Sequence, residues 1–178
     1  HALRAQLCYV PQAAFLFSGT SAANVGYGVD DADEDRIRAA ADVAQASDFI
    51  AERPEGLATP ISQGGTNVSG GQRQRLAIAR ALATDARAYL FDDSFSALDY
   101  KTDAALRHEL SSRLGGKTVV IVAQRISTVL NANQIVVLDD GRIVGAGTHE
   151  QLMESCQEYR EIAMSQLSEE ELKGGDAR

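Results

Sequence analysis

One continuous stretch, residues 68–99, limits the fold of this chain more than any other part of the sequence. It begins with a polar, glycine-containing turn, and apolar residues at helical spacing then run from about Ser69 to Thr84. A short apolar strand, Ala88 to Phe91, follows and ends on the paired carboxylates Asp92 and Asp93. A helix that turns directly back into a buried strand is typical of a layered α/β domain.

The rest of the chain repeats this alternation of strand and helix. Patterns of apolar, capping and turn residues predict a strand over 6–11, helices within 30–57 and over 99–114, and a strand over 118–123. The last of these is apolar and β-branched throughout, so we expect it to be buried in a parallel sheet. The dipeptide Asp140-Gly141, between two apolar runs, predicts a tight β-hairpin.

Composition excludes several function classes. The net charge is −8, which argues against nucleic acid as a partner, because phosphate binding usually leaves a basic footprint. No apolar run approaches the roughly 20 residues of a membrane-spanning helix. The two cysteines, Cys8 and Cys156, are far apart in sequence, so neither a disulfide framework nor a metal site is expected.

The helix beginning near Ser69 has a start that suits an anion. Ser-Gly-Gly exposes backbone N–H groups at the positive end of the helix dipole, where a terminal phosphate can bind. Taken alone, the same tripeptide is equally consistent with an ordinary turn and helix cap. Arg73, Arg75 and Arg80 add a basic face to this helix, which fits either a salt-bridged surface or a place near phosphate.

The strand tip at Asp92 strengthens the nucleotide interpretation. A carboxylate at the carboxyl end of a buried strand is where P-loop proteins hold the Mg²⁺ of a bound nucleotide, although such residues also begin ordinary turns. The twenty positions from Gln72 to Asp92 leave room for one helix and a return to the sheet. The two features together favour a nucleotide site.

With these residues in place, the chain resembles a nucleotide-binding domain of the ABC transporter family. Ser69-Gly70-Gly71-Gln72 resembles the family's signature motif, residues 89–92 its Walker B strand, and residues 96–99 its D-loop. Val10-Pro11-Gln12 is similar to the Q-loop, residues 59–65 to the X-loop of exporters, and residues 119–125 to the H-loop strand. The resemblance spans about residues 3–167.

The fold implied by this resemblance is a partial P-loop NTPase (RecA-like) α/β core with an inserted helical subdomain that carries the signature. We expect the partial domain to span residues 1–167, with the mainly helical subdomain at 13–84, the core part at 85–150 and a charged tail at 168–178.

The resemblance also implies roles for individual residues, with ATP and Mg²⁺ as cofactors. Asp92 would bind Mg²⁺ through water, and Gln12 would contact Mg²⁺ or the attacking water. The signature would clasp the γ-phosphate of ATP held by an opposite subunit, since these domains dimerise head to tail, and Asp99 would communicate across that dimer. The signature residues concerned are Ser69, Gly70, Gly71 and Gln72.

Two catalytic positions depart from the family pattern. Asp93 stands where an active domain has a catalytic Glu, and its side chain is shorter by one methylene, roughly 1.5 Å. A misplacement near 1 Å can slow catalysis by about a hundredfold. Gln124 stands in place of the switch His and cannot carry positive charge. Gln63, where many exporters have Glu, is a third and weaker departure from the family pattern. Together these changes resemble the degenerate half of a heterodimeric exporter.

The chain contains no G-x-x-x-x-G-K-[ST] motif to cradle the β-phosphate. We therefore expect a fragment of a half-transporter, inactive alone, at the cytoplasmic face of the cell membrane. Its partners would be the transmembrane domain of the same full-length chain and a second half-transporter. A soluble ABC-type ATPase without transport activity, or a non-catalytic dimerisation or regulatory module, remain alternatives; six membrane-spanning segments encoded upstream would separate them.

Overall fold

The computed structural model describes residues 6–30 and 32–167, and the chain divides into two compact units, residues 1–122 and 123–178. The tail expected at 168–178 lies outside the described residues. Within the described part, no helix has the length and apolar character needed to cross a membrane. In chain order the first unit contains β1 (Leu7–Val10), β2 (Gly19–Thr20), α1 (Ser21–Val25), α2 (Glu34–Val43), α3 (Ser47–Ala51), β3 (Pro60–Ile61), α4 (Gly70–Ala83), β4 (Ala88–Asp92), α5 (Tyr100–Arg113) and β5 (Thr118–Val122).

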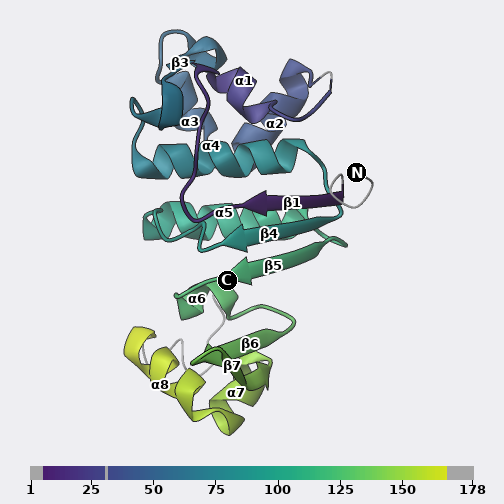
Figure 1. Ribbon diagram of the computed structural model, residues 1–178, viewed down its shortest axis with the longest axis vertical. Helices are drawn as coiled ribbons and strands as arrows, with labels where there is room; N and C mark the ends of the chain where they lie inside the picture. Colours follow the sequence, from purple (N-terminus) through teal and green to yellow (C-terminus); the bar gives the residue numbers. More distant parts are fainter. Residues whose placement is uncertain (1–5, 31, 168–178) are drawn as a thin grey trace. The chain divides into compact units, whose positions relative to one another are not determined.

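The central helix α4 has the start and end that the sequence predicted. Ser69 is its N-cap, and Ser69 and Gln72 form a capping box in which each side chain accepts a hydrogen bond from the other's backbone N–H. Its apolar residues are almost entirely buried, and α1 and α2 pack on one side while β1 lies on another (Figure 1). The helix thus connects the small helices to the sheet.

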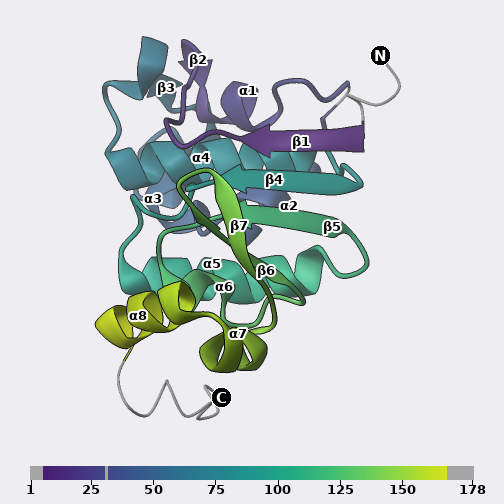
Figure 2. The ribbon, with the colours of Figure 1, turned by 60° about the horizontal axis from the view of Figure 1, so that its bottom comes forward.

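The main sheet has the strand order β1–β4–β5, and both neighbouring pairs are parallel. Figures 1 and 2 show α5 along one face of this sheet. Side chains alternate between the two faces, so Val10, Tyr89 and Phe91 are buried while Tyr9 and Leu90 are exposed on the other face.

The strand β5 is parallel to β4 as predicted, but the expectation that it is buried is wrong. Val119, Val120 and Val122 are 38%, 49% and 56% exposed. Among the described strands, β5 lies at the end of the sheet order, and one of its faces belongs to the open side of the sheet. A continuous apolar run shows that both faces of a strand suit burial, but it does not show that a neighbour covers them.

The three arginines of α4 have a structural role beyond the two considered from the sequence. Each donates to a backbone carbonyl of another segment: Arg73 to Gly64, Arg75 to Gln45, and Arg80 to Phe15 and Asn24. Burial lowers the pKa of Arg75 and of Arg80. These guanidinium groups anchor the surrounding loops and helices to α4.

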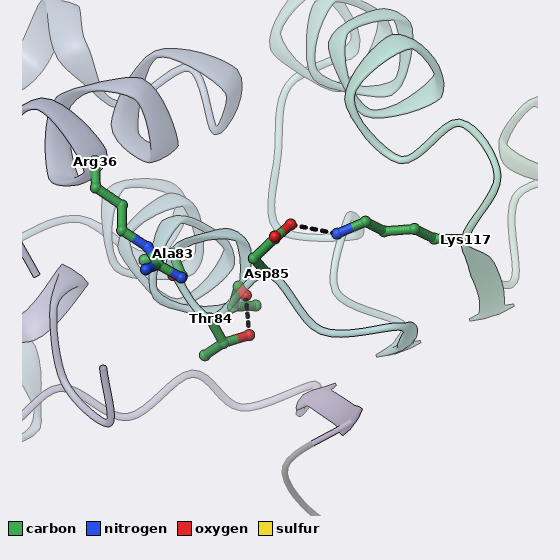
Figure 3. A network of polar contacts seen from close by, with 6 residues as sticks. Arg36, Ala83, Thr84, Asp85 and Lys117 are labelled. Atoms are coloured by element: carbon green, nitrogen blue, oxygen red, sulfur yellow. Dashed lines mark hydrogen bonds and ion pairs between the residues drawn. The ribbon is translucent and has the colours of Figure 1, made fainter. Parts of the chain in front are cut away.

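The carboxyl end of α4 is held by a second polar cluster (Figure 3). Arg36 of α2 donates through Nε to the carbonyl of Ala83 at 2.7 Å, satisfying one of the carbonyls that a helix end leaves unpaired. The next residues, Thr84 and Asp85, turn the chain back toward β4, and Asp85 pairs with Lys117 just before β5. This cluster links α2, α4 and the amino ends of the strands.

The second unit contains α6 (Ile126–Val129), β6 (Ile135–Asp139), β7 (Arg142–Gly147), α7 (His149–Ser155) and α8 (Gln157–Gln166). The predicted hairpin is confirmed: β6 and β7 are antiparallel, and the connecting residues Asp140 and Gly141 have φ of 45° and 73°. Positive φ at both central residues is what a two-residue hairpin turn requires. Leu152 and Tyr159 fill a small separate core.

The two compact units divide the chain differently from the subdomains expected at 13–84 and 85–150. The helical segment and all three strands of the main sheet belong to the first unit. The subdomain boundaries stay a prediction.

Candidate functional site

The carboxyl ends of β1 and β4 bring three of the predicted site residues to one edge of the sheet. Because these strands are parallel and paired through Val10 and Phe91, the residues that follow them meet at the same place. Asp92 and Asp93 are half-buried there, and Gln12, two residues beyond β1, is exposed. The site therefore places two carboxylates and one amide next to each other at the sheet edge.

Two hydrogen bonds join the strand ends through these side chains. The Gln12 amide donates through Nε2 to Asp93 Oδ2 at 3.1 Å, and the Tyr9 hydroxyl donates to Asp92 Oδ2 at 2.8 Å. The hydrogen bond to the Asp92 carboxylate raises the pKa of Tyr9, because it favours the protonated phenol. Tyr9 was not predicted from the sequence, although side-chain alternation places it on the same sheet face as Asp92.

A third contact ties the backbone of the two strand ends. Ser94 is 1% exposed, and its hydroxyl donates to the carbonyl of Val10 at 2.9 Å. The bond fixes the start of the segment that carries Gln12 against the turn that carries Asp93. Ser94 was not predicted either, since no local pattern identifies a contact between residues 84 positions apart.

The backbone at Asp93 has an uncommon conformation, with φ of 45°. Positive φ is rare outside glycine, and Asp is one of the few residue types enriched there, because its short side chain bonds locally. The side chain at this position is thus both short and carried on a sharply turned backbone.

The predicted phosphate-binding turn at the start of α4 is well formed. The capping box orients Ser69 and Gln72, and a Cβ added at Gly70 would meet nothing within 4 Å. A Cβ at Gly71 would lie 3.3 Å from the carbonyl oxygen of Ala97, so glycine permits the close approach of residues 96–98. This segment follows Asp93 in the chain and connects the sheet-edge carboxylates to the helix start.

Asp99 is the N-cap of α5, and its carboxylate makes the hydrogen bonds of that cap. Its carboxylate accepts hydrogen bonds from the Thr102 backbone N–H at 2.9 Å and from the Thr102 hydroxyl at 2.7 Å. These bonds, the one from the backbone first, lower the pKa of Asp99. The residue is exposed, so the helix cap and the predicted contact across a dimer are compatible roles.

Gln124 lies in the second unit, two residues after β5. Gln124 is exposed, and its backbone carbonyl accepts a hydrogen bond from the Gln166 side chain of α8 at 2.9 Å. The other predicted site residues all belong to the first unit. The weaker third departure, Gln63, accepts a hydrogen bond from the Ser18 backbone N–H at 3.1 Å.

The sheet edge suits Mg²⁺ bound together with a nucleotide. Over residues 6–30 and 32–167, no group of three or more His, Cys, Asp or Glu side chains forms a complete metal site. Mg²⁺ in phosphate chemistry typically needs only one or two carboxylates, and water and phosphate oxygens complete its shell. Asp92 supplies carboxylate oxygens of this kind. The Gln12 amide lies close by, hydrogen-bonded to the neighbouring Asp93.

Comparisons with known proteins identify the relatives of this chain. Residues 1–96, more than half of the chain, match the family described as ABC transporter. An uncharacterized ABC transporter ATP-binding protein of Mycobacterium tuberculosis is 48% identical over 160 residues, covering 88% of this chain and 27% of that protein. An ATP-dependent lipid A-core flippase of Saccharophagus degradans is 43% identical over 168 residues, covering 94% of this chain and 29% of the flippase.

A solved structure gives the same result in three dimensions. The structure of a bacterial Atm1-family ABC exporter with ATP bound superposes with a TM-score of 0.90 at 38% sequence identity. The match covers 94% of this chain and 30% of the exporter chain. The chain therefore spans less than a third of the length of these relatives.

Proposed function

Because the chain belongs to the ABC transporter family, we propose that it is the ATP-binding part of an exporter in which ATP hydrolysis drives transport across the membrane. The observation that carries the proposal is the meeting of Gln12, Asp92 and Asp93 at one sheet edge, with the phosphate-binding turn of α4 joined to it through residues 96–98. The exporter and flippase relatives support the direction of transport.

In this proposal the chain's residues have separate tasks at the nucleotide. Asp92 would bind Mg²⁺ through a water, and Gln12 would contact the ion or the attacking water. Bound Mg²⁺ neutralises charge on the phosphates and draws electron density from them. Ser69, Gly70 and Gly71 present the positive end of α4 to the γ-phosphate of a nucleotide on a second subunit, and the Gln72 side chain keeps that turn capped.

We further propose that the site containing Asp93 is the weaker of two. The carboxylate at this position is shortened and its Oδ2 is held by the Gln12 amide, so it is poorly placed to take a proton from an attacking water. The neutral Gln124 adds no positive charge to the transition state. The signature of α4 is complete, so it serves the competent site of the partner subunit.

This assignment places the domain at the cytoplasmic face of the membrane. It docks there on the transmembrane part of its own full-length chain, and a second half-transporter supplies the opposite nucleotide site, with Asp99 at the contact between them. The relatives extend well beyond the length of this chain, as expected if it belongs to a larger transporter.

The decisive experiment compares site-specific nucleotide trapping in the full-length exporter and its partner. The double variant Asp93→Glu plus Gln124→His should raise hydrolysis at the weak site by about 10- to 100-fold, the size expected when a misplaced base is restored. Asp140→Glu is a matched control, because Asp140 also has a φ of 45° but lies in the hairpin turn.

Unchanged trapping in the double variant would show that these two residues do not weaken the site. A separate substitution, Asp92→Asn, tests the coarser proposal, because it should abolish metal-dependent hydrolysis at the site that Asp92 serves. If both variants behave like wild type, the chain is not the ATP-binding part of an exporter in the sense proposed.

A further inference from the structure

Tyr9 occupies a place on the open face of the sheet from which it reaches the metal-binding carboxylate. The register pairs Tyr9 with Leu90, so Asp92, two residues beyond Leu90, lies diagonally ahead on the same face. The Tyr9 hydroxyl donates to Asp92 Oδ2 at 2.8 Å. Tyr9 is 59% exposed, and its hydroxyl is the atom that reaches the neighbouring strand end.

The hydrogen bond restricts how the Asp92 carboxylate can turn. A carboxylate at a strand tip can rotate about its side-chain bonds, and a donor fixed in the adjacent strand removes that freedom. With Oδ2 held by the hydroxyl, Oδ1 keeps both of its lone pairs for a water that a metal would carry. Residues that orient a direct metal ligand typically change metal affinity or activity by about 10- to 100-fold when they are removed, and because Asp92 acts through a water we expect the low end of this range for Tyr9.

We propose that Tyr9 is a positioning residue that orients Asp92 for Mg²⁺. This inference rests on the proposed function, since it takes Asp92 as the carboxylate that serves the metal. Tyr9 touches neither the nucleotide nor the metal in this scheme, and it acts only through Asp92. The backbone tie from Ser94 to Val10 supports it, because that bond holds the two strand ends at a fixed separation.

The test measures metal binding in the full-length exporter, with Mn²⁺ as the probe in place of Mg²⁺. Free Mn²⁺ is followed by electron paramagnetic resonance during titration in the presence of a non-hydrolysable ATP analogue. Tyr9→Phe, which removes only the hydroxyl, should weaken Mn²⁺ binding at this site by about 10-fold. Affinity for the analogue without metal should stay unchanged, whereas a general loss of structure would lower both.

Two further variants define the outcome. Tyr27→Phe removes a hydroxyl from a tyrosine of similar exposure, 56%, in the helical part of the same unit. Its Mn²⁺ affinity should match that of wild type. Asp92→Asn identifies the share of Mn²⁺ binding that belongs to this site. If Asp92→Asn removes that share and Tyr9→Phe does not weaken it, the positioning role is refuted while the proposed function stands. If Asp92→Asn also has no effect, the metal assignment fails and the role of Tyr9 fails with it.

Discussion

Arg80 gives the sharpest test of how the helical part is held on α4. Its guanidinium donates through Nε to the carbonyl of Asn24 at 2.8 Å, through one terminal nitrogen to Phe15 O at 3.0 Å, and through the other to Asn24 Oδ1 at 2.8 Å. The group also lies 5.2 Å from the Phe17 ring centroid and 5.8 Å from that of Tyr27. One side chain therefore joins α1 and the segment before it to α4.

The substitution Arg80→Lys keeps the charge but loses the fork, since an ammonium is a compact point charge. We expect Lys to recover one of the three hydrogen bonds, and the two lost bonds contribute about 1 kcal/mol each. Asn24 Oδ1 also accepts from the Phe17 backbone N–H, so it keeps one partner after the substitution. The net loss of about 2 kcal/mol corresponds to a roughly 30-fold increase in local opening.

Hydrogen exchange of the full-length protein, read by mass spectrometry, measures this opening directly. Amides of α1 should exchange about 30-fold faster in Arg80→Lys, while those of α5 keep their wild-type rate. Arg38→Lys is the matched control, because Arg38 is 60% exposed and pairs with Glu34 one turn away on the same helix. An α1 exchange rate within threefold of wild type in Arg80→Lys, about 0.6 kcal/mol, would refute the anchoring role.

Three other outcomes follow from single contacts and can be read by the same method. Gly116→Ala should destabilise the end of α5 by about 1 kcal/mol, because Gly116 has a φ of 80°, whereas Gly115→Ala should be nearly neutral since Gly115 lies outside the left-handed region. Ser94→Ala should raise exchange in β1 by about fivefold, the loss of one buried hydrogen bond of about 1 kcal/mol. The Lys117 hydrogen bond lowers the pKa of Asp85, so Asp85 stabilises the fold above the ordinary carboxyl pKa near 4 and this contribution disappears as the pH falls through the lowered value. Wild type and Asp85→Asn should therefore differ by less than about 1 kcal/mol at pH 7, since the Asp85 side chain is 62% exposed, and should converge in acid.

Features that depend on neighbours in sequence were predictable, and those that depend on register were not. The cap at Ser69 and the turn at Asp140 follow from local chemistry, and the structure confirms both. The exposure of Val120 could not be read from β-branched character, because burial depends on what packs above a strand. Ser94 contacts Val10 across 84 positions, and only the pairing of two strands brings such residues together.

The structure alters the explanation for the weakness expected at Asp93. From the sequence, the defect is only a missing methylene. In the fold, the same residue has a left-handed backbone, which Asp tolerates better than most residues, and its carboxylate is bonded to Gln12 at 3.1 Å. The short side chain of Asp93 therefore fits both its left-handed backbone and the hydrogen bond that it accepts from Gln12. Lengthening Asp93 would disturb the Gln12 contact as well as extend the carboxylate, so a gain in hydrolysis in the double variant with Gln124→His would come with release of the Gln12–Asp93 hydrogen bond.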